Sequence, residues 1–255
     1  MGLSERTIAN EVVSKCFFWR APDTRSRIHF FPTAGTAGGH YPVACSLRLF
    51  GKGLKDRSVE LEGGRVSQPD GFRIEDAFPD LPSDISGPVG LEVGLKVSQG
   101  RLNLLGSEVF IESSSAQMNM VYNGAPFRVV RRGDGDSVRV ESLASKRTGV
   151  VAVQGGQTAS LIIINTGLDS AKPKLTMFRE EREDSVQLGT IGPLTVFEFP
   201  LHELLMQGAQ KHQIQSTEVQ IAPVCCSLSE DIAQLEFYVL YRDANSKTPC
   251  FVNVL

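Results

Sequence analysis

The chain has 255 residues, of which 41% are hydrophobic and 22% are charged, and its formal net charge is −3. This composition is ordinary for a globular protein and excludes wholesale disorder. Acidic and basic residues are divided evenly between the two halves, so neither half is the basic module that nucleic-acid binding requires. A chain of this length can form two domains of about 100–150 residues each.

The N-terminus and the cysteines indicate a cytoplasmic protein. The first ten residues, MGLSERTIAN, are polar and lack the apolar segment of a secretory signal. No apolar run is long enough to cross a bilayer, so we expect no membrane insertion. The five cysteines are an odd number, and Cys16, Cys45 and Cys250 lie in apolar segments, which is typical of reduced thiols used as small core residues. The alternative is a secreted protein whose signal has been removed.

Short apolar or alternating segments recur along the chain, separated by Gly, Pro, Asn, Asp and Ser. This spacing favours antiparallel sandwiches or barrels, and no alternation of strands with helices points to a parallel sheet. In the first half, strands are expected at Val12–Trp19, Ile28–Phe31, Val43–Phe50, Ser58–Leu61, Arg73–Phe78, Leu91–Val97 and Val109–Glu112. In the second half, they are expected at Gln117–Tyr122, Phe127–Arg131, Ser137–Glu141, Val150–Val153, Ser160–Asn165, Lys174–Phe178, Leu194–Phe199, Glu218–Cys226, Leu235–Arg242 and Phe251–Val254. Short helices are expected at Asp80–Ile85 and Leu201–Ala209.

Two segments resemble each other: SLRLFGKGLKD at Ser46–Asp56 and SLIIINTGLDS at Ser160–Ser170. Gly53 and Gly167 stand where each strand must reverse, and glycine adopts positive φ without steric cost. Similar features follow in the same order, so we expect an internal duplication; the alternative is that two β domains share generic turn chemistry. The polar segment SSSAQ separates the copies, which then span residues 8–113 and 118–255.

The fold prediction is therefore an all-β protein of two tandem antiparallel β-sandwich domains, Ig-like or jelly-roll-like, with one or two short helices. The pattern NTGLDSAKPKLTMF followed by GPLTVFEFP, at residues 165–200, resembles small bacterial β-sandwich proteins, including those of the sensory-rhodopsin-transducer type. The resemblance implies an antiparallel sandwich in the second half.

One segment partly fits a zinc-protease pattern. In HELLMQGAQKH, His202, Glu203 and His212 match the metzincin motif, in which three histidines bind the metal and the glutamate is the general base. Met206 occupies the position of the second ligand, and a thioether is a poor zinc ligand. We therefore expect an amphipathic turn or helix here and predict no metal ligand.

Three other segments contain residues that occur in functional motifs, but each is better explained by a structural role. The loop TAGTAGGHYP at residues 33–42 lacks the glycine spacing of a phosphate-binding loop. RRGDGD at residues 131–136 contains two aspartates and an adhesion-like triplet, but it is typical of an Asp-Gly hairpin turn and lacks the further ligands of a calcium loop. Cys225 and Cys226 are adjacent on an expected strand, so their side chains point to opposite faces.

These observations predict a non-catalytic binding or structural module that presents loops or strand edges to a protein partner, or to another copy of itself in an oligomer. We expect no catalytic residue and no cofactor. Two alternatives are a metal-dependent or hydrolytic enzyme with spatially clustered histidines, and a small-ligand sensor or transducer with a cavity between sandwiches. The expected partner-binding residues lie in three loops: Gly38, Gly39, His40, Tyr41, Asp80, Asp84, Glu180, Glu181 and Arg182.

Overall fold

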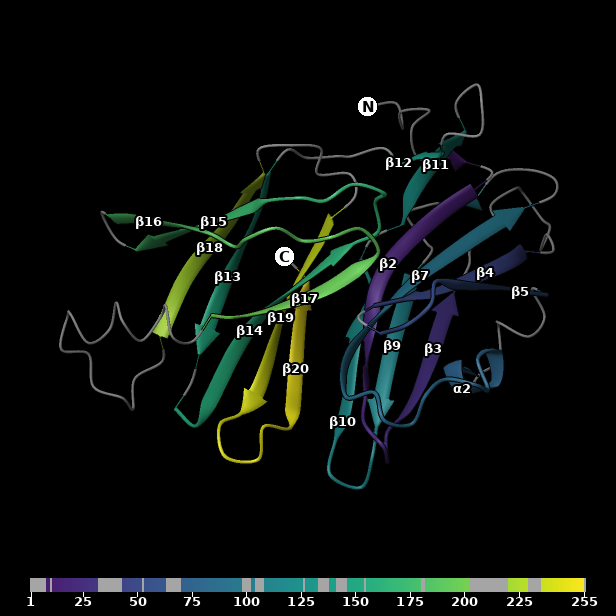
Figure 1. Cartoon of the computed structure of the whole chain (residues 1–255), viewed down its shortest axis with the longest axis horizontal. Helices are drawn as coiled ribbons and strands as arrows, with labels where there is room; N and C mark the ends of the chain where they lie inside the picture. Colours follow the sequence, from purple (N-terminus) through teal and green to yellow (C-terminus); the bar gives the residue numbers. More distant parts are fainter. Residues whose placement is uncertain are drawn as a thin grey trace. The chain divides into compact units, whose positions relative to one another are not determined.

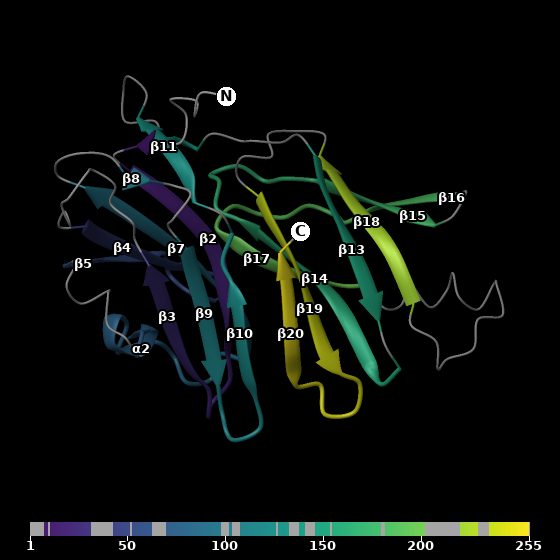
Figure 2. The same cartoon turned by 180° about the vertical axis from the view of Figure 1, so that it is seen from behind.

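A computed structural model gives the fold of the chain (Figures 1 and 2). It describes residues 8–9, 11–31, 43–51, 53–62, 70–97, 102–103, 108–125, 127–132, 138–140, 146–153, 155–179, 182–201, 220–228 and 235–254. Within this part of the chain, almost all regular structure is antiparallel β-strand, which confirms the all-β prediction.

The chain divides into two compact units. The first comprises Met1–Ala116 and Val121–Ser142, and the second comprises Gln117–Met120 and Leu143–Leu255. The sequence-based division at residues 113–118 differs from this one in that it assigns residues 121–142 to the second half.

The first unit contains three sheets. The largest has the strand order β12–β11–β2–β7–β4–β5, and its strands are β12 Val138–Val140, β11 Arg128–Arg132, β2 Glu11–Arg20, β7 Gly87–Val97, β4 Val43–Phe50 and β5 Arg57–Leu61. The next has the order β10–β9–β3–β6, with β10 Asn119–Asn123, β9 Glu108–Ser114, β3 Arg25–Phe31 and β6 Phe72–Arg73. The smallest pairs β1 Ile8–Ala9 with β8 Leu102–Asn103.

Side-chain hydroxyl groups cap one edge of β2. Its other edge pairs with β7 along its whole length, whereas β11 pairs with it only at Val12 and Val13. Beyond these two residues, the Phe17 N–H donates to the hydroxyl of Tyr122 (3.1 Å), and the Trp19 N–H donates to Ser113 Oγ (3.1 Å). Buried backbone donors need such partners, so side chains of β9 and β10 complete the edge of β2.

The helix of the first unit lies where the sequence predicted a strand. The expected strand at Arg73–Phe78 and the expected helix at Asp80–Ile85 are both wrong, because α2 covers Ile74–Ala77 and turns follow it. Ile74 and Phe78 are both buried, and residues four apart share one face of a helix, which packs beside β3 (Figure 1). Pro79 disfavours helical backbone at the residue before it, so the helix ends there.

The second unit contains two four-stranded sheets. One has the order β13–β18–β15–β16, with β13 Lys146–Val153, β18 Gln220–Leu228, β15 Pro173–Arg179 and β16 Arg182–Gln187. The other has the order β17–β14–β19–β20, with β17 Thr195–Pro200, β14 Gln157–Asn165, β19 Leu235–Asp243 and β20 Pro249–Val254. The charged strand β16 had no counterpart in the sequence prediction.

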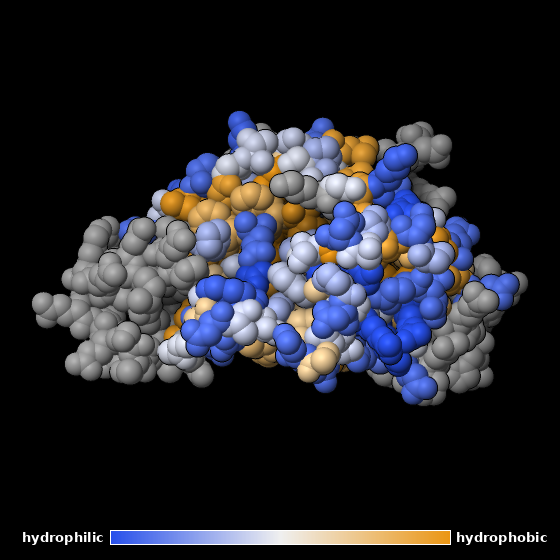
Figure 3. Space-filling view, turned by 60° about the horizontal axis from the view of Figure 1, so that its bottom comes forward, coloured by the Kyte–Doolittle hydropathy of each residue, from blue (hydrophilic) through white to orange (hydrophobic). Residues whose placement is uncertain are grey.

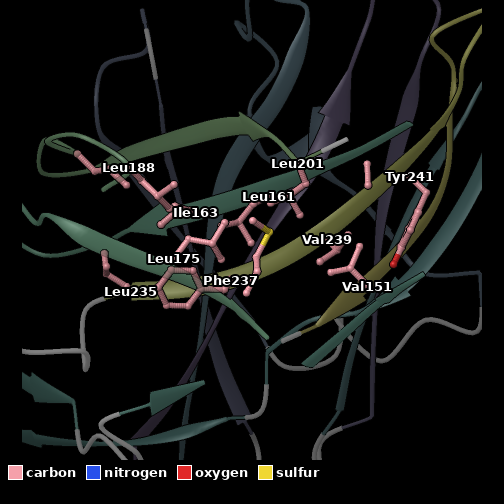
Figure 4. Close-up of a cluster of buried hydrophobic side chains, with 13 residues drawn as sticks. Val151, Leu161, Ile163, Leu175, Leu188, Leu201, Leu235, Phe237, Val239 and Tyr241 are labelled. Atoms are coloured by element: carbon pink, nitrogen blue, oxygen red, sulfur yellow. The ribbon is translucent and has the colours of Figure 1, made fainter. Parts of the chain in front are cut away.

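One apolar core joins these two sheets (Figure 4). Leu161 and Ile163 of β14 and Phe237 of β19 meet Leu175 of β15 in this cluster, so both sheets bury one face in it. The alternate residues of β14 and β19 are buried too: Ile162, Ile164, Tyr238 and Leu240. This explains the continuous apolar run in SLIIIN, which is typical of a strand buried on both faces.

The two similar segments differ in structure. Gly53 has φ of 78°, as expected for a glycine that reverses a strand, whereas the left-handed glycines of the described chain do not include Gly167. After the first turn, β5 returns to pair with β4 in the same sheet. After the second, β15 joins the other sheet of its unit.

Candidate binding surfaces

The sequence-predicted loop residues are only partly within the described chain. Gly38, Gly39, His40, Tyr41, Glu180 and Glu181 lie outside it, as do the histidine pair of the zinc-like segment and Gly133 and Asp134 of the RGD triplet. Arg182 begins β16 and stands opposite Arg179 of β15.

Asp80 and Asp84 are exposed on the loop after α2. The buried side chains of Phe78 and Leu81 anchor the base of this loop, and the N–H of Leu81 donates to the carbonyl of Phe78 (3.1 Å). Arg57 of β5 forms an ion pair with Asp80, whose side chain is 74% exposed. The loop is therefore an acidic, anchored projection, and one of its two carboxylates already has a partner.

Asn165, at the end of β14, connects two loops of the second unit. It is fully buried, and its amide nitrogen donates to the carbonyls of Asp169 (2.9 Å) and Gly192 (2.9 Å). Its side-chain oxygen accepts the N–H of Gly167 (2.9 Å), which is an Asx turn. These bonds fix the backbone of the loop at whose tip Leu168 is 81% exposed.

The edge strands of the sheets differ in whether they contain charged residues. Each of the four larger sheets has two edge strands in the described chain, and six of these eight strands contain a charged residue. The exceptions are β10 (NMVYN) and β20 (PCFVNV). Charges on an edge oppose pairing with another strand, so β10 and β20 are the edges least protected against it.

β20 also exposes apolar and thiol groups. Among the described strands it pairs only with β19, and its Phe251 is 51% exposed. Cys250 is exposed and free, which corrects the prediction that it is a core residue, whereas Cys16 and Cys45 are buried as expected. Burial raises the pKa of the Cys45 thiol to about 12, so this group is inert, and Cys250 is the accessible thiol among these three.

A row of charged groups crosses the larger sheet of the first unit. Lys15, Glu92 and Arg48 occupy matched positions on β2, β7 and β4. Arg48 Nε and Nη2 donate to the carboxylate of Asp56, both at 2.7 Å, and Arg48 Nη1 lies 3.9 Å from Glu92 Oε1. With Asp56 included, the row contains two cations and two anions and has no net charge. Such a balanced row stabilises the sheet and does not attract a charged ligand.

The pKa values of its two carboxyls move in opposite directions. Burial raises the pKa of Glu92, against the opposing effects of Lys15 and Arg48. The hydrogen bond from Arg48 lowers the pKa of Asp56. The same guanidinium therefore stabilises a buried carboxylate and a more exposed one.

Within the described ranges, no three His, Cys, Asp or Glu side chains are grouped so that they could hold a metal ion. Of the four histidines, only His29 lies in this part of the chain, and its Nε2 is 2.8 Å from Glu112 Oε2. The described helices include none that is long and apolar enough to cross a membrane. No family model matches the sequence, and no curated protein matches it.

Proposed function

We propose that this chain is a non-catalytic binding or structural protein that presents strand edges and loops to a protein partner or to another copy of itself. The observation that carries the proposal is β20, an uncharged edge strand with an exposed aromatic side chain. Unprotected edges of this kind pair with strands of other chains through their backbone groups, and side chains such as Phe251 add apolar contact area.

The partner most directly supported is a second copy. Two identical edge strands that pair antiparallel are related by a two-fold axis, so a single surface suffices and the assembly closes as a dimer. The anchored loops at Asp80–Asp84 and at Leu168 are further surfaces for a different protein.

The architecture proposed with this function is a pair of antiparallel β-sandwiches. The core shared by the two sheets of the second unit supports it for that unit. The internal duplication predicts that β4 and β14 occupy equivalent positions when experimentally determined structures of the two units are superposed. The proposed setting is cytoplasmic, which the free thiols of Cys16, Cys45 and Cys250 support.

Light scattering of the full-length chain over a range of concentrations tests the proposal. We expect a concentration-dependent dimer mass for the unchanged chain and a monomer mass for Phe251→Lys, because a lysine at the edge opposes pairing. Leu168→Lys is the matched control, since it places the same charge at an exposed apolar position away from β20.

If Phe251→Lys remained a dimer, β20 would not be the dimer interface. A chain that is monomeric at every concentration would refute pairing between copies. Circular dichroism spectra of the variants establish that each is folded.

A further inference from the structure

Two arginines stand directly opposite each other on β3 and β6. Arg27 and Arg73 are register partners, so their side chains leave the same face of the sheet. Like charges in directly opposite positions destabilise a strand pair. Arg25 lies two residues before Arg27 and therefore projects from this face as well.

Within the part of the chain that the structure describes, none of the three guanidinium groups has a carboxylate partner. Among the described residues, the side chains of Arg25 and Arg73 make no hydrogen bond or ion pair, and the side chain of Arg27 bonds only to a backbone carbonyl. The turn before β6, helix α2 and strand β9 carry five carboxylates: Asp70, Glu75, Asp76, Glu108 and Glu112. Glu112 is the register partner of Arg27 on β9 and is engaged by His29. Glu75 is engaged by Arg20, and the other three of these described carboxylates form no ion pair with these arginines.

The turn at Asp70–Gly71 holds two side chains of this face in place. Arg27 Nη1 donates to the carbonyl of Asp70 (2.6 Å). The imidazole of His29 lies against Gly71, because a Cβ at that position would be 2.6 Å from the ring. The hydrogen bond between His29 Nε2 and the carboxylate of Glu112 (2.8 Å) fixes the orientation of the imidazole. The face is thus arranged before any ligand arrives.

We propose that Arg25, Arg27 and Arg73 form a binding site for a tetrahedral oxyanion, such as the phosphate group of a small ligand. A guanidinium group presents paired N–H donors that match two oxygens of a phosphate or sulfate. An oxyanion between Arg27 and Arg73 converts their repulsion into two attractive interactions. Figure 3 shows that hydrophilic residues cover much of the described surface in this view.

Isothermal titration of the full-length chain with inorganic phosphate tests this site, with chloride added to keep the ionic strength constant. We expect saturable binding of one phosphate per chain, and similar binding of sulfate. The double variant Arg27→Gln/Arg73→Gln should bind phosphate at least about tenfold more weakly, because it loses charge-assisted hydrogen bonds. Lys174→Gln, an exposed lysine on β15, should bind as the unchanged chain does.

The unfolding temperature without phosphate gives a second readout. The double variant should unfold at a higher temperature than the unchanged chain, because it removes the repulsion between like charges. With phosphate the order should reverse, since a ligand stabilises the state that binds it. Equal phosphate affinity in the variant and the unchanged chain, or no binding of phosphate or sulfate, would overturn the proposal.

Discussion

The amide nitrogen of Asn165 lies 2.9 Å from the carbonyl oxygen of Gly192, and this bond joins two loops at one end of the second unit. The same side chain closes a turn by accepting the N–H of Gly167. A single buried amide thus satisfies donors and acceptors of two loops, which a backbone bridge between Ala171 and Ile191 also connects.

Replacing Asn165 should therefore destabilise the second unit. Asn165→Ala leaves buried backbone groups without partners, and we expect a loss of about 2–3 kcal/mol. Asn165→Asp keeps the acceptor for the N–H of Gly167, but it places a carboxylate oxygen against the carbonyls of Asp169 and Gly192. Because these oxygens repel each other, the aspartate variant should lose more stability than the alanine variant. Urea unfolding followed by circular dichroism measures both losses, and hydrogen exchange locates them. An aspartate variant as stable as the unchanged chain would contradict the assigned bonds.

Gly71→Ala should be more damaging than Gly53→Ala. Both glycines have positive φ, 73° and 78°, so both variants carry the cost of about 1 kcal/mol for an alanine in that conformation. Only at Gly71 would the new Cβ meet another group, the ring of His29, because nothing lies within 4 Å of the corresponding position at Gly53. Each variant lowers the unfolding temperature, and the difference between the two decreases measures the cost of the contact with His29. Equal shifts would show that the ring moves away without cost.

Arg48→Gln should raise the pKa values of both Asp56 and Glu92, because the guanidinium lowers each of them. The Asp56 carboxylate stabilises the folded chain above its unfolded pKa, and this contribution is lost as the pH falls through its lowered folded pKa. The charge on Glu92 has the opposite effect: it costs stability above its raised folded pKa, and the cost is relieved as the pH falls.

The variant should consequently be less stable than the unchanged chain at neutral pH, and the difference should shrink once both carboxyls are protonated. Carboxyl-carbon NMR of the two side chains measures the pKa values directly. Lys55→Gln, which removes an exposed charge nearby in the sequence, serves as the control. A fall in either pKa would contradict the geometry of the row.

A fragment that ends at Ser115 should fold poorly, whereas one that ends at Ser142 should fold. The shorter fragment lacks Tyr122, which bonds to the backbone of Phe17, and it also lacks β11, which extends the larger sheet. Its core strand β2 would have an unsatisfied edge. Proton NMR dispersion of the two fragments distinguishes them. Well-dispersed spectra from both would favour the boundary at residues 113–118.

Local pattern accounts for most of the strands, and its failures have physical causes. Val43–Phe50 was predicted with the bounds of β4, because alternating buried and polar residues are a strong local signal. β16 was missed because REDSVQ has little strand propensity, and the strand forms through its antiparallel pairing with β15. The spacing of Ile74 and Phe78 suits a helical turn, which the prediction of a strand did not weigh.

The candidate sites were harder to predict from the sequence than the strands. β20 was predicted as a strand, but its place at the edge of a sheet depends on the order of strands distant in the chain. The opposition of Arg27 and Arg73 requires the register between two segments that nothing local specifies. For Asn165, the glycine two positions later was a signal of an Asx turn, whereas the bond to Gly192 was visible only in the fold.

The capped edge of β2 has a consequence for synthesis. This strand contains CFFW and leaves the ribosome before Ser113 and Tyr122, which supply the groups that complete its edge. Until those residues emerge, a hydrophobic strand with open backbone groups is exposed to other nascent chains. The first unit should therefore depend on chaperones during translation, and a translational pause before residue 122 should increase its aggregation.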